Sequence, residues 1–366
     1  MSMAPLLAAT QNTSMFDPAS PPAVWIRDVA VLALAVTGFI FVVVEAVLLY
    51  CLVRFRRGRA PLTPNPSPPT GEGGNLETPL PSGERGRGEG ATEPPQVYGS
   101  KPIEIAWTVG PLLIVFVLVL VSTRALWEIN TDPPGPRPGD NALFVTVVGR
   151  QWWWEYDYDH YNGEKYNFAT ANELHVPAGD GTTARPVYLT LKSADVCHSF
   201  WVPRLAGKTD LIPGRTNHMW FQTSQPGLYV GQCAEFCGAQ HANMLLRVVV
   251  DPPDEFDRWL DRQKGDALKP PDDDRQAQDG RDLLVKQSCV NCHRVRGVAD
   301  KGTYAPDLTH LMSRQTLGSG MIPNTHDNLR KWVGDPQRFK PGCLMPAFGL
   351  SDHDADDIVH YLETLK

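Results

Sequence analysis

The 366-residue chain has no excess of basic residues and no clear secretion signal at its start. It carries 34 Lys and Arg against 41 Asp and Glu, for a net charge of −7, so its composition does not indicate nucleic-acid binding. No basic residue precedes the apolar run at residues 6–9, which is too short for the core of a signal peptide. We therefore interpret residues 1–27 as an external tail of the mature protein, with cleavage left open.

Two stretches have few charges. Residues 29–53 and 105–123 each approach the roughly 20 apolar residues that a helix needs to cross a bilayer. The alternative for each is a buried core helix, but the length of the runs favours spanning. A basic cluster follows the first run, at Arg54, Arg56, Arg57 and Arg59. By the positive-inside rule, we expect the segment between the runs in the cytoplasm and both termini outside, in a protein that crosses its membrane more than once.

The segment between the runs is rich in Pro, Gly, Ser and Glu and cannot bury a core. We predict a disordered cytoplasmic loop over 58–97 inside a helical hairpin over 28–128. Ionisable groups are costly in apolar helices, which draws attention to Glu45 and Glu104. Glu104 has the alternative of a simple interfacial acid at a helix N-terminus. Glu45 faces a partner subunit or snorkels, and its role is open.

A soft-ligand motif lies in GQCAEFCGAQHANM, residues 231–244. It places Cys233, Cys237, His241 and Met244 within twelve residues, and His198 lies upstream in DVCHSF. Thiolate, thioether and imidazole are ligands that suit copper, and this set is typical of copper electron-transfer sites. The motif therefore indicates a chain that moves electrons.

The spacing of this motif predicts two copper ions. Two bridging thiolates with one imidazole on each side would hold them, with Met244 as a weak cap and the backbone oxygen of Glu235 as the remaining ligand. One alternative is a tetrahedral zinc site from the two cysteines and two histidines, which has no use for Met244. A disulfide between the two cysteines is the other, and it leaves both histidines and the methionine unexplained.

A second redox motif stands near the C-terminus. Cys289, Cys292 and His293 form C-x-x-C-H, in which two thiols bond the vinyl groups of a c-type haem and the histidine binds its iron. A zinc knuckle would need two further ligands. His310 and His326 are available for it, but no second cysteine pair accompanies them.

The sixth iron ligand should be a methionine, because Met/His ligation raises the haem potential into the range of an electron carrier. Met312, Met321 and Met345 compete. Met345 lies in PGCLMP, residues 341–346, where two prolines fix the loop. We predict Met345, against the alternative of an ordinary core methionine.

Between the hairpin and the haem motif, short runs rich in Val, Leu, Tyr and Phe alternate with turn residues. This spacing predicts an antiparallel β sandwich or barrel over 140–252, after a hinge at 131–140. The expected strands are 142–148, 186–192, 218–223, 228–232 and 245–250.

The remaining chain is expected to be helical. Residues 253–274 are interpreted as a polar linker. Residues 275–366 are interpreted as a small all-α cytochrome domain, with helices over 275–287 and 351–365. Ser351 with Asp354 resembles a capping pair at the start of the last helix.

Aromatic and acidic residues follow the first expected strand, in QWWWEYDYDHY. We interpret Trp153 and Trp154 as core or interface residues, while at least one tryptophan of the cluster could be an exposed point where electrons enter beside the copper. The neighbouring acids could steer a basic partner or could form a solvated strand end. They are Glu155, Asp157 and Asp159.

These motifs together resemble subunit II of haem-copper cytochrome c oxidase. The resemblance is carried by EIAWT (104–108), QWWWEY (151–156), DVCHSFWVP (195–203), GKTDLIPGRTN (207–217) and the cysteine motif. Residues 275–366 are similar to the cytochrome c domain fused to that subunit in some bacterial oxidases. Two features depart from the family: the long loop at 60–95, and Cys197 beside a copper ligand, which we expect to pack as a small apolar side chain.

The resemblance implies a two-helix transmembrane hairpin, a cupredoxin-like β sandwich and a class I cytochrome c domain. It implies a binuclear CuA centre whose ligands are His198, Cys233, the Glu235 carbonyl, Cys237, His241 and Met244. It also implies that the Glu235 side chain helps to bind Mg at the interface with subunit I. By the same comparison, Trp152 receives electrons and Glu104 marks the mouth of a proton pathway.

The resemblance also implies a function, that of the electron-input subunit of a respiratory oxidase that is an oxidoreductase and translocase. Electrons from a cytochrome c or an upstream respiratory complex would pass through haem and CuA to subunit I, where oxygen becomes water with coupled proton translocation. Subunits I and III and membrane lipid are the expected partners. One alternative is a CuA-containing nitric oxide reductase, which would carry the same motifs. The other is a copper-delivery protein, and that protein would need neither the covalent haem nor Met244.

Overall fold

The computed structural model describes residues 12–56, 99–131, 141–180 and 183–366. It divides into two compact units, one formed by residues 32–121 and the other by residues 1–31 and 122–366. The predicted loop over 58–97 and hinge over 131–140, with the first residues of the predicted tail, lie almost wholly outside the described residues.

Two long apolar helices come first. Helix α2 covers Pro21–Arg54 and helix α3 covers Lys101–Asn130, and their most apolar windows have mean hydropathy of 2.6 and 2.5 with none of their residues buried. Both are long and apolar enough to cross a membrane. They extend beyond the predicted runs, since α2 begins eight residues earlier, in PPAVWIRD, and α3 continues at both ends into segments that carry charged residues.

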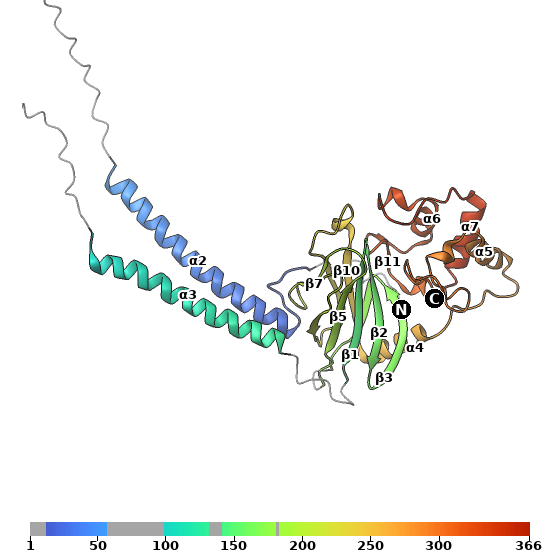
Figure 1. Ribbon diagram of the computed structural model, residues 1–366, viewed down its shortest axis with the longest axis horizontal. Coiled ribbons are helices and arrows are strands. Elements are labelled where there is room, and N and C mark those ends of the chain that lie inside the picture. Colours follow the sequence, from blue (N-terminus) through green and yellow to red (C-terminus); the bar gives the residue numbers. More distant parts are fainter. Residues whose placement is uncertain (1–11, 57–98, 132–140, 181–182) are drawn as a thin grey trace, which may run out of the picture. The chain divides into compact units, whose positions relative to one another are not determined.

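The middle of the chain is a sandwich of two five-stranded sheets (Figure 1). The first has the order β3-β2-β1-β5-β8, and the second has the order β4-β10-β9-β6-β7. The strands are β1 (Leu143–Arg150), β2 (Trp153–Tyr161), β3 (Glu164–Ala171), β4 (Glu173–Pro177), β5 (Val187–Ser193), β6 (His198–Trp201), β7 (Thr209–Leu211), β8 (Asn217–Phe221), β9 (Gly227–Cys233) and β10 (Leu245–Asp251).

Alternating burial along β1 and β2 turns one face of the first sheet toward the core, as a period of two residues requires. The predicted β sandwich, of cupredoxin-like type, is confirmed, and each of the five expected strands is present. The other strand pairs within the two sheets are antiparallel, but β1 pairs with β5 and β10 pairs with β4 in parallel. The aromatic segment after β1 is itself a strand, β2.

A helix absent from the prediction follows the sandwich. Helix α4 covers Pro253–Lys264, inside the segment interpreted as a polar linker. Its residues Phe256, Trp259 and Leu260 are buried in the same hydrophobic core as the strands. The linker interpretation was wrong for this part. Most residues of the helix are charged, so the overall composition is polar although its few apolar residues lie on one face at helical spacing.

The C-terminal part is helical, with α5 (Arg275–Lys286), α6 (His326–Gly334), α7 (Asp352–Leu362) and a short hairpin of β11 (Thr316–Leu317) and β12 (Ile322–Pro323) (Figure 1). Helices α5 and α7 approach closely at Gly280, where an added Cβ would lie 1.9 Å from the carbonyl oxygen of Asp357. The predicted cap is present, since Ser351 accepts a hydrogen bond from the backbone N–H of Asp354. This part has its own hydrophobic core.

Candidate redox sites

The copper motif is held where strands of the second sheet begin and end. His198 is the first residue of β6, and Cys233 is the last residue of β9. Cys237 lies in the loop that follows, and His241 begins the short 3-10 helix η1 (His241–Asn243). Met244 immediately precedes β10. Paired strands therefore fix both ends of the motif.

The structure brings the predicted ligand atoms together. The two sulfur atoms of Cys233 and Cys237 are 3.8 Å apart. The Nδ1 atom of His198 lies 3.9 Å from the Cys233 sulfur, and the Nδ1 atom of His241 lies 3.5 Å from the Cys237 sulfur. The remaining two predicted ligands complete the cluster, with the carbonyl oxygen of Glu235 3.3 Å from the Cys233 sulfur and the sulfur of Met244 3.8 Å from the Cys237 sulfur.

The two thiols titrate as a pair. The hydrogen bond shared with Cys237 lowers the pKa of Cys233 to about 3, against the opposing effect of burial. The same contact, with burial, raises the pKa of Cys237 above its ordinary value. Without metal, the pair therefore holds one proton between two sulfur atoms. A soft cation would displace that proton, because thiolates are the form that binds metals.

This geometry bears on the alternatives for the motif. A disulfide does not fit, because the sulfur atoms are far beyond the roughly 2.05 Å of an S–S bond and both cysteines are free. A single zinc ion would use four ligands and leave the sulfur of Met244 without a role, although that sulfur is buried in contact with Cys237. One imidazole beside each sulfur is the arrangement expected of two bridged ions.

Asp195 is a functional candidate that the sequence analysis missed. Its Oδ1 atom lies 2.8 Å from the Nε2 atom of His198, and its carboxylate accepts hydrogen bonds from the backbone N–H groups of Gln151 and Val196. Burial raises the pKa of Asp195, but these hydrogen bonds outweigh it and hold the pKa below its ordinary value. The carboxylate therefore orients the ring of His198 so that Nδ1 faces the sulfur atoms.

Replacing Asp195 by alanine should weaken copper binding about 10- to 100-fold, the usual cost of removing a ligand's hydrogen-bond partner. Competition with a copper chelator, followed by the copper absorption bands, measures this loss. Asp254→Ala, an exposed acid in α4, is the matched control. Copper retention equal to that of the unmodified protein would contradict the orienting role.

Trp152 connects the copper motif to a second site. Its indole Nε1 donates a hydrogen bond to the carbonyl oxygen of Cys237 at 2.8 Å, and the amide of Gln151 donates to the same oxygen at 2.7 Å. Trp152 is 9% exposed, so its indole is mostly buried beside the copper motif, and its role in electron entry stays a prediction. Trp154 is fully buried, as expected of a core residue, and Trp153 is partly buried.

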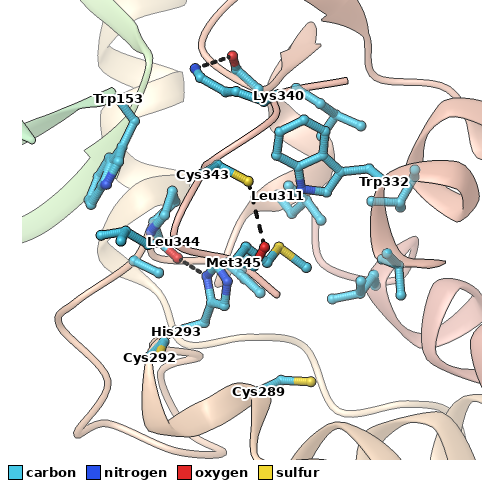
Figure 2. A pocket seen from close by; sticks show the side chains of 18 of the residues that line it. Trp153, Cys289, Cys292, His293, Leu311, Trp332, Lys340, Cys343, Leu344 and Met345 are labelled. Atoms are coloured by element: carbon cyan, nitrogen blue, oxygen red, sulfur yellow. Dashed lines mark hydrogen bonds between the residues drawn. The ribbon is translucent and has the colours of Figure 1, made fainter. Parts of the chain in front are cut away.

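The C-x-x-C-H motif opens into a large apolar cavity. About 1410 Å³ of space between atoms, part of it open to solvent, is lined by Cys289, Cys292, His293 and Met345 and by Trp152 and Trp153 from the β sandwich. Figure 2 shows the imidazole of His293 and the side chain of Met345 in this cavity, with both cysteines on the segment beside them. The cavity therefore offers two thiols that could bond the haem vinyl groups, and an imidazole and a thioether that could bind the iron.

The orientation of His293 suits iron binding. Its Nδ1 atom lies 2.7 Å from the carbonyl oxygen of Pro306, which leaves Nε2 free as a ligand atom. Burial lowers the pKa of His293, which favours the neutral imidazole that binds metals. The residues therefore fit a c-type haem.

The axial methionine is distinguished by position. Of the described residues, Met345 lines the cavity, whereas Met312 and Met321 do not. Gln337 holds the loop of Met345, since its amide donates to the carbonyl oxygens of Met345 at 2.7 Å and Cys343 at 2.9 Å. This placement supports Met345 as the sixth ligand, which stays a prediction.

The zinc-knuckle alternative lacks free ligands. Both ring nitrogens of His310 contact backbone carbonyl oxygens, those of Lys366 and Gly265. The Nδ1 atom of His326 lies 3.0 Å from the carboxylate of Glu363. Neither residue is among those that line the cavity.

Several other predicted residues lie away from both clusters. Glu104 is in the first turn of α3, as expected of an acid at a helix N-terminus, and Glu45 is an exposed residue of α2. Glu235 contributes its carbonyl to the copper cluster and leaves its side chain exposed. The expectation for Cys197 was wrong, because this residue is exposed rather than packed, immediately before β6.

The acids after Trp154 are engaged within the sheet. Glu155 forms an ion pair with Arg150 at 2.6 Å, and Asp159 accepts a hydrogen bond from Thr146. Burial, with repulsion from these two acids, raises the pKa of Asp157 to about 6. Such partly buried, paired groups are weaker candidates for steering a partner than free surface charges.

Comparison with known proteins agrees with this architecture. Residues 143–251 match the family described as cytochrome c oxidase subunit II, periplasmic domain, and residues 277–366 match cytochrome c. The chain is 32% identical over 358 residues to cytochrome c oxidase subunit 2 of Alkalihalophilus pseudofirmus, covering 97% of this chain and 92% of the relative.

A further relative is cytochrome c oxidase subunit 2 of Bacillus sp. (strain PS3), which is 33% identical over 77% of this chain and 79% of its own. The crystal structure of the periplasmic domain of subunit II of cytochrome oxidase of Bradyrhizobium japonicum is similar at 31% identity and a TM-score of 0.30. It covers 35% of this chain and 96% of that domain. This chain therefore belongs to the cytochrome c oxidase subunit 2 family and carries, in addition, a cytochrome c domain.

Proposed function

We propose that this protein is the electron-input subunit of a respiratory cytochrome c oxidase. Electrons enter at the cytochrome c domain, pass to the copper-binding β sandwich and leave for oxidase subunit I, where oxygen is reduced to water with coupled proton translocation. One observation carries the proposal: the indole of Trp152 hydrogen-bonds the copper-ligand residue Cys237 and also lines the cavity of the C-x-x-C-H motif.

We assign the residues of the two clusters as the groups that would hold the two cofactors. The binuclear CuA centre is held by His198, Cys233, the Glu235 carbonyl, Cys237, His241 and Met244. The covalent haem is held by Cys289, Cys292, His293 and Met345. When bound, these groups supply the one-electron oxidation states, which the protein chain itself lacks. The chain contributes fixed positions, an apolar surrounding and the tryptophan contact between the two sites.

The proposed setting is the bacterial plasma membrane. The family and two apolar helices support a membrane-anchored protein, and we place both termini and both redox domains on the periplasmic side. Arg54, in the last turn of α2, and Arg56 support a cytoplasmic position for the segment between the helices.

The proposed partners are oxidase subunits I and III, an external cytochrome c or upstream respiratory complex, and membrane lipid. The exposed side chain of Glu235 is free to share a Mg ion with subunit I. Glu104 is proposed to lead protons into that subunit, and Trp152 is proposed to receive electrons from the haem domain rather than directly from a soluble donor.

Gas consumption by the purified complex tests the proposal. With a reduced cytochrome c or quinol donor, we expect oxygen uptake that stops when the copper is removed. Consumption of nitric oxide without oxygen uptake would instead identify a nitric oxide reductase. Mononuclear, readily exchanged copper without haem would identify a copper-delivery protein.

A further inference from the structure

Lys340 is a buried lysine in the segment that leads to Met345. It is 3% exposed, and its Nζ atom lies 2.7 Å from the carbonyl oxygen of Trp152, 2.8 Å from that of Asn243 and 3.0 Å from that of Gly318. An ammonium group has three N–H donors, so each donor has one carbonyl acceptor. In its protonated form, Lys340 therefore has every N–H donor paired.

The three acceptors explain why a lysine is tolerated at this depth. Burial lowers the pKa of Lys340 to about 7, whereas carbonyl acceptors favour the protonated form. A neutral amine has two donors and would leave one of the three carbonyls unpaired. An apolar side chain would leave all three unpaired, which is costly for buried polar groups.

The acceptors belong to two different domains. Trp152 and Asn243 are in the β sandwich, and Asn243 lies directly before the copper-ligand candidate Met244. Lys340 and Gly318 are in the cytochrome domain. The next residue, Pro341, accepts a hydrogen bond from the amide of Gln240 at 2.7 Å. We call residues 234–244, between β9 and β10, the copper loop. The segment that leads to Met345 is therefore hydrogen-bonded to the copper loop on both sides of His241.

A tight turn adds a backbone contact at the same place. The backbone N–H of Leu245 donates to the carbonyl oxygen of Ser319, and the hydroxyl of Ser319 donates to the carbonyl oxygen of Leu245, both at 3.2 Å. Gly320 has φ of +84°, and a Cβ there would lie 3.1 Å from the Cβ of Leu245. The glycine allows both the turn and the close approach.

A buried acid makes a second polar anchor between the domains. Glu173, 1% exposed, accepts hydrogen bonds from the backbone N–H of Gln315 at 2.9 Å and from the hydroxyl of Thr316 at 2.7 Å. Arg247 donates to the amide oxygen of Gln315 at 2.9 Å. Hydrogen bonds are directional, so these contacts form only when the two domains are in this one relative position.

We propose that Lys340 is a positioning residue that locks the cytochrome domain onto the copper loop in a single register. The role rests on the proposed electron-input function, because a fixed contact matters where Trp152 and Trp153 line the haem cavity. Figure 2 shows Lys340 and Trp153 at this cavity. Loss of the lock would lower the fraction of molecules in the docked state, and the rate of transfer between the domains would fall with it.

Lys340→Met in the full-length, metal- and haem-loaded protein tests the lock, with Ser319→Ala as a milder variant and Lys286→Met, an exposed lysine at the end of α5, as the control. Two readouts are needed. Hydrogen exchange of residues 240–245 and 316–321 reports docking. The rate at which one electron passes from the haem domain to the copper domain, after a pulse of photoreductant, reports transfer.

We expect faster exchange in both segments and about tenfold slower transfer in Lys340→Met, a smaller change of the same kind in Ser319→Ala, and no change in Lys286→Met. Optical and paramagnetic resonance spectra should stay unchanged, which shows that both sites are loaded. Unchanged exchange and transfer in both lock variants would overturn the proposal. Faster exchange in Lys340→Met, combined with no transfer in the unmodified protein, would support the lock and contradict the electron-input function.

Discussion

Replacing Cys233 by serine should abolish the paired copper centre. Cys233 contacts three of the predicted ligand groups, those of His198, Glu235 and Cys237, so its sulfur would serve as a central copper ligand that a serine hydroxyl cannot replace. Copper affinity should fall by more than the roughly 10- to 100-fold expected when only a ligand's hydrogen-bond partner is lost. Paramagnetic resonance should show no mixed-valence pair, and electron delivery to the partner subunit should stop.

Cys197→Ser is the matched control for this prediction. Cys197 lies next to the ligand candidate His198 in the sequence, but its side chain is exposed. We expect this variant to keep its copper and its spectrum. A mixed-valence signal that survives in Cys233→Ser, or that disappears in Cys197→Ser, would show that the cluster is assigned to the wrong sulfur atoms.

Replacing Met345 by alanine should remove the sixth ligand of the haem iron. The absorption band that arises from sulfur-to-iron bonding in the ferric protein should be lost. Axial ligands set haem potentials over a range of about 0.8 V, so the midpoint potential should fall by at least about 0.1 V. Redox titration of the purified protein, followed at the haem bands, measures the change.

Two other methionines serve as controls for the Met345 variant. Met312→Leu and Met321→Leu change residues that do not line the haem cavity, and both should keep the band and the potential. Survival of the band in Met345→Ala would reject the assignment. Loss of the band in one of the controls would identify the true ligand.

Much of this architecture is predictable because its signals are local in the sequence. Apolar runs long enough to cross a bilayer, short runs of strand-forming residues between turn residues, and the three fixed residues of C-x-x-C-H each favour one interpretation without knowledge of distant contacts. The copper motif is similar, since most of its ligands lie within twelve residues. His198 is the distant predicted ligand, and its position beside Cys233 depends on the β6–β9 pairing that the structure provides.

The features that escaped prediction depend on contacts between distant segments. Helix α4 carries so many charges that composition indicated a linker, and its burial of Trp259 depends on the sandwich beside it. Asp195 gave only a weak signal, a carboxylate three residues before a ligand histidine. Lys340 gave none, because its acceptors Trp152 and Asn243 are about 190 and 100 residues away in the chain.

Metal analysis combined with paramagnetic resonance of the full-length, matured protein tests the central claim most directly. We predict two copper ions and one haem iron per chain, with one unpaired electron shared equally between the two coppers in the oxidised state. Zinc at this site, or a single copper ion with an ordinary mononuclear spectrum, would contradict the account.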